Sequence, residues 1–230
     1  MDFDIITENL KKGFDHWKDN LVAYLVAMII SIVVGSIIGS IASVFGLFGF
    51  ISAILSGSFA GMGMAFVGMI ISLVLVICIT APLDVGLVYM AIKGTRGEKV
   101  EITDVFYAFK SMSVYIRTLI FIVVFFVLLG IFSIIPFIGT LIFMILFIYT
   151  VFIYIMTPSE GIVYALKESF NIAKDNLVMT IIALLVVLVL NFIGSIPFGL
   201  GLFITVPISF IFITYILKEL KPDIKDDSGL

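Results

Sequence analysis

The sequence predicts an all-α integral membrane protein: six transmembrane helices in three hairpins, amphipathic helices at the cytoplasmic interface, and an internal repeat. Composition is the first reason. Hydrophobic residues make up 62% of the 230 residues and charged residues 13%, and the mean hydropathy is +1.31. A soluble domain of this length could not bury so much apolar surface. The second reason is the placement of charge, which is absent from residues 20–83, 118–159 and 176–217.

Each charge-free stretch predicts one helical hairpin. The last two stretches have about forty residues each, which is two crossings of a core about 30 Å thick at about 1.5 Å per residue. The first stretch is longer than two spans need, and a short re-entrant or interfacial helix at residues 42–61 remains open. Proline-containing tips, "SIIPFIGTL" and "SIPFGLGLF", are expected to turn the second and third hairpins.

All 13 Lys and Arg residues lie in the four remaining segments. The positive-inside rule therefore predicts a multi-pass protein of a prokaryotic plasma membrane with both termini in the cytoplasm. One polytopic domain is expected over residues 1–220. It divides into an interfacial helix (1–20), a first hairpin (21–93), a second hairpin (103–157), and a further interfacial helix with the third hairpin (158–220). Residues 221–230 form a cytoplasmic tail.

An internal repeat links the interfacial segments. "LKKGFDHWKDNLV" at residues 10–22 aligns without a gap to "LKESFNIAKDNLV" at residues 166–178. Both copies are amphipathic at helical spacing, so we expect them to lie in the plane of the interface. The apolar stripe of the first copy comprises Phe3, Ile6, Leu10, Phe14, Trp17 and Leu21.

A second repeated phrase, "PLDVGLVY" and "PSEGIVY", follows two of the expected spans. Proline should break or kink each returning helix, and the predicted breaks are Pro82, Pro158 and Pro207. Asp84 and Glu160 would then occupy the first turn of a new helix, where the dipole stabilises a carboxylate. The alternative is a contact with an ion or substrate. Trp17, Tyr89, Tyr164 and Tyr215 are the expected interface anchors.

The segment "GLVYMAIKGTRGEKVEITDVFYAFK" (residues 86–110), with the following proline-tipped hairpin and "ALKESFNIAKDNLV", resembles a family of uncharacterised prokaryotic six-helix membrane proteins. That family is related to the membrane domains attached to some glycerophosphodiester phosphodiesterases. The resemblance implies membrane residence. It implies no catalytic activity, because the chain has no room for their soluble catalytic barrel.

The residues of catalytic and metal chemistry are scarce. His16 is the single histidine, expected on a solvated surface, and Cys78 is the single cysteine, so neither a metal site nor a nucleophilic pair is predicted. We therefore expect no enzyme and no cofactor, and the net charge of −3 argues against nucleic acid. Two small-residue stripes favour helix packing and leave open a homo-oligomer: Gly35, Gly39 and Ser43, and Gly57, Gly61 and Ala65.

Two functional interpretations follow. The first is a non-enzymatic module that binds membrane lipids or organises the membrane through its cytoplasmic interfacial helices. The second is a channel or transporter for a small solute or ion, favoured by hairpin repeats and glycine-rich helices. The absence of charge in the middle of the spans argues against coupled transport, and the first interpretation is preferred.

Overall fold

A computed structural model describes residues 3–56 and 59–227, and this part of the chain contains helices and no strand. Six helices are long and apolar enough to cross a membrane: Leu21–Ile41, Phe66–Thr95, Met112–Phe132, Ile138–Met156, Leu177–Ser195 and Leu202–Leu220. In each of these helices, between 17% and 50% of the apolar stretch is buried inside the protein, so much of every span faces outward. These helices indicate a multi-pass membrane protein.

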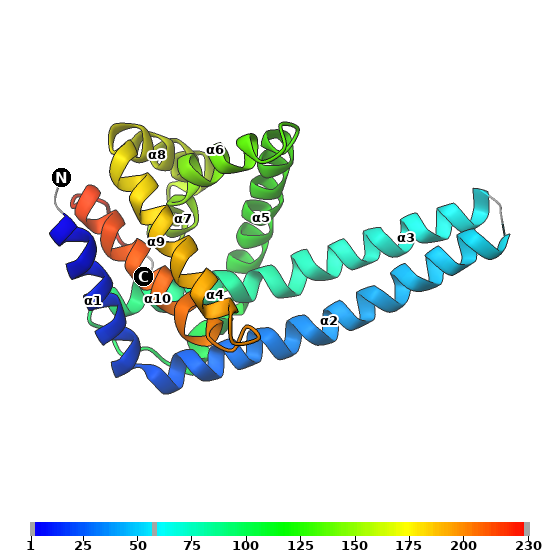
Figure 1. The fold of residues 1–230 in the computed structure, drawn as a ribbon, viewed down its shortest axis with the longest axis horizontal. Helices are drawn as coiled ribbons and strands as arrows, with labels where there is room; N and C mark the ends of the chain where they lie inside the picture. Colours follow the sequence, from blue (N-terminus) through cyan, green and yellow to red (C-terminus); the bar gives the residue numbers. More distant parts are fainter. Residues whose placement is uncertain (1–2, 57–58, 228–230) are drawn as a thin grey trace.

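Two long helical segments form an arm that projects from the rest of the protein (Figure 1). Helix α1 (Phe3–Asp19) leads into α2 (Leu21–Ser56), which pairs with α3 (Phe59–Leu75). The 36 residues of α2 extend about 54 Å, well beyond a membrane core of about 30 Å. Residues 42–56 simply continue α2, so the separate re-entrant helix considered for this region is absent from the described residues.

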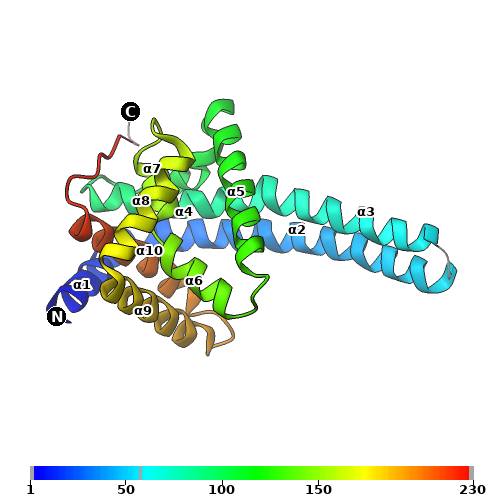
Figure 2. The same ribbon diagram turned by 90° about the horizontal axis from the view of Figure 1, so that it is seen from above.

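The remaining helices gather around the base of this arm. Helix α3 passes through the π-helical segment η1 (Val76–Thr80) into α4 (Ala81–Thr95). The later elements are η2 (Ile102–Phe109), α5 (Met112–Phe132), α6 (Ile138–Phe147), α7 (Thr150–Met156), α8 (Gly161–Asp175), α9 (Leu177–Ser195) and α10 (Leu202–Leu220). Helix α5 runs across the direction of the α2–α3 arm in both views (Figures 1 and 2). The six apolar helices therefore do not form one parallel bundle.

The three prolines expected to break helices have three different outcomes. At Pro82 the helix is not broken: η1 joins α3 to α4, and the Ala81 N–H bonds to the Val76 carbonyl. Pro207 lies inside the continuous helix α10. Pro158 lies in the turn between α7 and α8, which Gly161 completes with a φ of +78°. A π-bulge absorbs a proline by widening one turn, and this explains why Pro82 does not end its helix.

The two proline-containing tips expose aromatic rings. Phe137 follows Pro136 with a φ of +62°, and the Ile138 N–H bonds to the Pro136 carbonyl at 2.7 Å, which closes a tight γ-turn. Phe198 follows Pro197 with a φ of +52°. Phe137 is 90% exposed and Phe198 is fully exposed. Positive φ is strained for such residues, so each tip holds its aromatic ring outward at an energetic cost.

Helix α1 packs against α10 (Figure 1). A Cβ added to Gly13 would lie 3.6 Å from both the Ile208 carbonyl oxygen and the Phe212 backbone nitrogen, so the two backbones approach closely here. Trp17 is only 7% exposed and belongs to a core cluster with Leu87. The expectation that Trp17 faces lipid headgroups was therefore wrong, because protein covers this part of the apolar stripe. Of the rest, Phe14 and Leu21 are exposed, whereas Phe3 lies outside the residues whose side chains the structure describes.

The tyrosines predicted as anchors also differ in their surroundings. Tyr89 is buried and stacks on Tyr107 with ring centroids 4.1 Å apart, and the Lys110 ammonium lies over the Tyr89 ring at 4.9 Å. Tyr89 is thus a contact between α4 and η2, and it does not face lipid as the anchor prediction required. Tyr164 and Tyr215 are half-buried.

Candidate functional site

The two copies of the repeat share a local hydrogen-bond pattern at the junction between two helices. Asn20, between α1 and α2, donates from Nδ2 to the His16 carbonyl at 3.1 Å. Asn176, between α8 and α9, donates from Nδ2 to the Ile172 carbonyl, also at 3.1 Å. Each asparagine caps the end of one helix while its own carbonyl accepts the first bond of the next. The repeated "KDN" thus marks a helix-to-helix corner.

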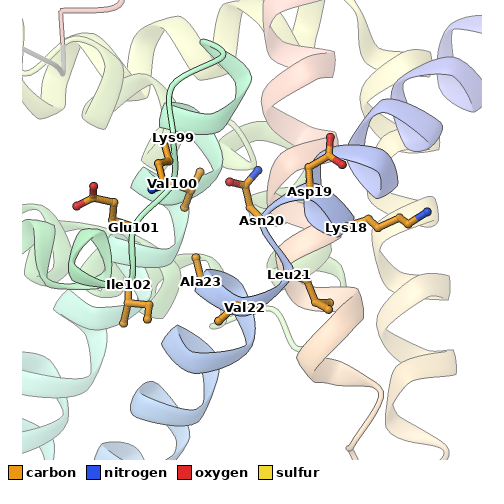
Figure 3. Close-up of a pocket in the computed structure, with 10 residues that line it drawn as sticks. All are labelled: Lys18, Asp19, Asn20, Leu21, Val22, Ala23, Lys99, Val100, Glu101 and Ile102. Atoms are coloured by element: carbon orange, nitrogen blue, oxygen red, sulfur yellow. The ribbon is translucent and has the colours of Figure 1, made fainter.

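A cavity of about 550 Å³ opens beside the first of these corners. Its walls come from the α1–α2 junction and the segment between α4 and η2 (Figure 3). The lining residues are Lys18, Asp19, Asn20, Leu21, Val22, Ala23, Lys99, Val100, Glu101 and Ile102. Asn20 points across the space toward Val100, whereas Lys18 and Glu101 lie at opposite edges (Figure 3). The cavity is therefore open and polar at its rim.

The charged groups at the rim are mixed in sign and mostly unengaged. Lys18 and Lys99 have no ion-pair or hydrogen-bond partner among the described residues. Asp19 makes no hydrogen bond there either. The Glu101 carboxylate accepts the Asp104 N–H as part of a capping box, and the Thr103 hydroxyl donates to it at 3.5 Å. Two ammonium groups and two carboxylates thus surround one space.

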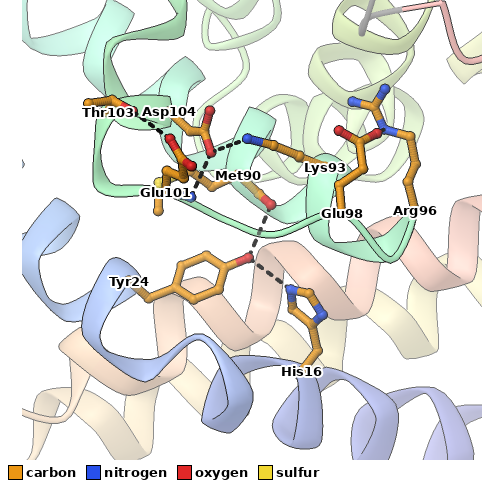
Figure 4. Close-up of polar contacts among 9 residues, drawn as sticks. All are labelled: His16, Tyr24, Met90, Lys93, Arg96, Glu98, Glu101, Thr103 and Asp104. Atoms are coloured by element: carbon orange, nitrogen blue, oxygen red, sulfur yellow. Dashed lines mark hydrogen bonds and ion pairs between the residues drawn. The ribbon is translucent and has the colours of Figure 1, made fainter.

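A network on the α4 side holds the Lys99–Glu101 wall in position (Figure 4). Lys93 Nζ lies 2.8 Å from Asp104 Oδ2, and the same oxygen accepts the Glu101 N–H at 2.8 Å. Asp104 is 4% exposed, so this ion pair is largely shielded from solvent. Because breaking one side of a buried ion pair leaves an uncompensated charge, the pair positions the start of η2 firmly.

The junction wall is held by a second network around the only histidine (Figure 4). The Tyr24 hydroxyl donates to the Met90 carbonyl at 3.2 Å, which leaves its oxygen to accept from His16 Nε2 at 3.3 Å. A Cβ added to Gly94 would overlap the His16 ring. Burial lowers the pKa of His16 below its ordinary value, and the Asp19 carboxylate offsets part of this shift. His16 is half-buried and packed, not solvated as expected.

The C-terminal tail folds back over the same end of the molecule. The Asp227 N–H donates to the Met156 carbonyl at 2.9 Å, and the Ser159 hydroxyl donates to Asp227 Oδ2 at 3.0 Å. Arg96 Nε lies 3.5 Å from Asp226 Oδ2 as an ion pair. Residues 221–227 therefore tie the ends of α4 and α7 together.

Asp84 and Glu160 do not occupy equivalent positions. Asp84 lies in the first turn of α4, but this turn continues from η1 and so offers no free helix N-terminus. Its side chain is exposed and has no partner among the described residues. Glu160 is the N-cap residue of α8, exposed, and its side chain makes no capping bond. The expected dipole stabilisation therefore does not apply to Asp84.

The small-residue stripes are also placed in part. A Cβ added to Gly35 would lie 3.6 Å from Thr80 Cγ2 of η1, whereas one added to Gly39 would have no neighbouring atom within 4 Å. Ser43 Oγ donates to the Gly39 carbonyl of its own helix at 2.7 Å. Gly57, Gly61 and Ala65 lie outside the residues whose surroundings the structure describes. Asn191 Nδ2 donates to Ser209 Oγ of α10 at 3.1 Å, so it joins α9 to α10.

Sequence reasoning did not single out the cavity residues Asp19, Asn20, Lys99 and Glu101. The repeated "KDN", which contains Asp19 and Asn20, was a local signal for two of them. The sequence could not predict that residues 99–102 form the opposite wall of the cavity, because packing of the folded chain brings them close to residues 18–23. No protein-family model, no curated protein and no solved structure matches this chain.

Proposed function

We propose that the chain is a non-enzymatic membrane module that binds phospholipid at the cavity beside Asn20 and thereby helps to organise the surrounding lipid. The main supporting observation is the order of charged and apolar side chains along the cavity. Charged side chains form the rim, and the exposed apolar residues Leu21, Val22 and Ile102 lie below them (Figure 3). Leu21 is also the first residue of an apolar span. A headgroup at the rim would place its acyl chains along α2.

The wider surface supports a lipid partner. The arm formed by α2 and α3 exposes apolar side chains along its length, including Val44, Leu47, Phe50 and Val67. A continuous exposed apolar surface marks an interaction site. In a multi-pass protein the membrane itself is the apolar solvent that covers it. The length of α2 implies that the arm tilts within the bilayer or thickens it locally, which is how long helices deform lipid.

The proposal places both termini, the cavity and the loops near Arg96 and Lys167 in the cytoplasm of a prokaryotic cell. The support is the confinement of Lys and Arg to four segments. Cysteines introduced at Thr95 and Lys225, in a Cys78→Ser background, should be protected from an impermeant thiol reagent in intact cells and labelled after lysis. Labelling of either position in intact cells would reject this orientation.

Lipid retention tests the function directly. The protein should keep bound phospholipid through purification, and mass spectrometry of the intact complex should count it. The double variant Lys18→Gln with Lys99→Gln should lose lipid, because both unpaired ammonium groups at the rim are removed. Lys174→Gln, at the matching position of the second repeat copy, is the control and should retain it. Equal lipid retention by both variants would reject the cavity as the binding site.

Transport of a small solute or ion is the second candidate, and Asp84 is the observation that favours it. An exposed carboxylate without a protein partner inside an apolar helix is a common feature of ion pathways. Flux of ions and small anions into proteoliposomes would test this reading. A measurable flux that Asp84→Asn abolishes in a stable protein would favour transport over the lipid-binding proposal.

A further inference from the structure

The cavity beside Asn20 carries a balanced set of charges, and this balance bears on which headgroup it accepts. We infer that the cavity selects phospholipids with a zwitterionic headgroup that carries both a phosphate and a primary ammonium, the phosphatidylethanolamine class. This inference rests on the proposed lipid-binding function and specifies its ligand.

The charge balance is the first step. Lys18 and Lys99 can supply donors to a phosphate, because neither has a partner among the described residues. Asp19 and Glu101 can accept from an ammonium group, since a carboxylate that accepts one N–H keeps further acceptor sites. A headgroup of net charge zero satisfies both pairs. A net-negative headgroup would satisfy the lysines but leave the two carboxylates facing like charge.

Two other hollows lack this balance. One of about 350 Å³ is lined by Phe147, Leu166, Lys167, Phe170 and Asn171. Another of about 230 Å³ is lined by Arg117, Ile120, Phe121, Tyr154, Pro158, Ser159, Gly161 and Ile162. Each has one cationic side chain and no carboxylate. A cation with no neighbouring acid suits any phosphate and does not discriminate among headgroups.

The second copy of the repeat provides a natural comparison. Its Lys174 and Asp175 lie 4.0 Å apart as an exposed ion pair, whereas Lys18 makes no such pair with Asp19. The lysine and the aspartate of "KDN" therefore pair with each other in the second copy, whereas Lys18 and Asp19 remain unpaired among the described residues of the first. The first copy also faces Lys99 and Glu101 across the cavity.

The position of the cavity favours a lipid over a water-soluble zwitterion. Val22 is 68% exposed and Ile102 is 37% exposed, and both lie on the lower side of the cavity. These apolar groups would contribute nothing to a soluble headgroup but would contact the glycerol backbone and the first methylenes of a phospholipid. Binding should therefore require the acyl chains.

A competition experiment tests the preference. The purified protein is stripped of lipid with excess detergent, incubated with equal amounts of dioleoyl phosphatidylethanolamine and dioleoyl phosphatidylglycerol, re-purified, and analysed for bound lipid by mass spectrometry. The unaltered protein should retain phosphatidylethanolamine in excess by about fivefold, the scale of one exposed charge pair. Chainless glycerophosphoethanolamine should not displace it.

The sharpest variant is Asp19→Asn, which removes a carboxylate and should shift retention toward phosphatidylglycerol by about fivefold. Asp175→Asn is the matched control and should leave the ratio unchanged. Thermal melting of each variant verifies that the fold persists, and Asp19→Glu should restore the original preference.

The outcomes separate the two proposals. Equal retention of the two lipids by the unaltered protein, with lipid still lost in the Lys18→Gln and Lys99→Gln double variant, overturns the headgroup preference and leaves lipid binding intact. No retention of either lipid overturns both. Displacement by the chainless headgroup overturns the assignment to a lipid, and an equal shift in Asp19→Asn and Asp175→Asn overturns the assignment to this cavity.

Discussion

The Tyr115 hydroxyl of α5 donates to the Cys78 carbonyl at 2.9 Å. Cys78 lies in η1, four residues before Pro82, whose ring nitrogen carries no hydrogen. An ordinary residue at position 82 of an α-helix would donate to this carbonyl, so Tyr115 supplies a hydrogen bond that proline cannot. A side chain from a neighbouring helix thus allows a proline to remain inside an apolar segment, where an unpaired carbonyl is costly.

Tyr115→Phe should therefore lower the free energy of unfolding by about 1 kcal/mol, since interhelical hydrogen bonds in membranes are of that order. Thermal melting in detergent measures the change. Tyr154→Phe is a matched control, because Tyr154 stacks on Phe121 and its hydroxyl has no hydrogen-bond partner among the described residues. In a Pro82→Ala background the cost of Tyr115→Phe should shrink. An undiminished cost there would separate the Tyr115 bond from the proline.

The close approach of α4 and η2 requires a glycine. A Cβ added to Gly86 would overlap the Val105 carbonyl, and η2 cannot retreat without disturbing the Lys93–Asp104 ion pair. Gly86→Ala should destabilise the protein by about 1 to 3 kcal/mol. Gly39→Ala is the control, because nothing lies within 4 Å of its Cβ and alanine favours helix. Melting temperatures of the two variants should differ clearly, and equal values would contradict the packing of α4 on η2.

Acid should loosen the corner between α1 and α2. Because burial holds the pKa of His16 below its ordinary value of about 6.5, the folded state favours the neutral imidazole. This stability is fully present above the unfolded pKa and is lost as the pH falls below about 6.5 toward the folded pKa. The melting temperature should therefore fall between pH about 7.5 and about 5.5. His16→Gln, which cannot titrate, should show a smaller fall.

The single tryptophan should be shielded from both water and lipid. Trp17 is 7% exposed and packed among core residues, so neither aqueous iodide nor lipid-borne quenchers should reduce its emission strongly. Strong quenching by lipid-borne quenchers would show that α1 is not packed on α10 as described.

The tip residue Phe137 should behave in the opposite way. Phe137→Trp, combined with Trp17→Phe, places the only indole at a fully outward position of an apolar turn. Lipid-borne quenchers should then reduce the emission markedly, because the tip contains no charged residue and is expected at or within the outer membrane face. Iodide quenching alone would place this tip in water. The background substitution removes no hydrogen bond seen in the described part of the chain, since Trp17 Nε1 has no partner there.

The sequence by itself determined the helical class and the six apolar segments. Hydropathy is a local property: a charge-free run of sufficient length must be helical in lipid, because only a helix satisfies its own backbone there. The hydrogen bonds of the Asn20 and Asn176 corners also follow from local sequence, since each asparagine bonds within its own preceding turn.

Tertiary structure alone decided which faces are covered and which charges remain free. From the sequence, the apolar stripe containing Trp17 could face either lipid or protein. In the folded chain α10 packs against α1, and Trp17 is buried. Two similar proline phrases gave a π-bulge at Pro82, where the Tyr115 hydroxyl reaches the Cys78 carbonyl, and a turn at Pro158. The candidate lipid site exists only where residues 18–23 meet residues 99–102. Such contacts depend on the whole packed chain, and no local pattern encodes them.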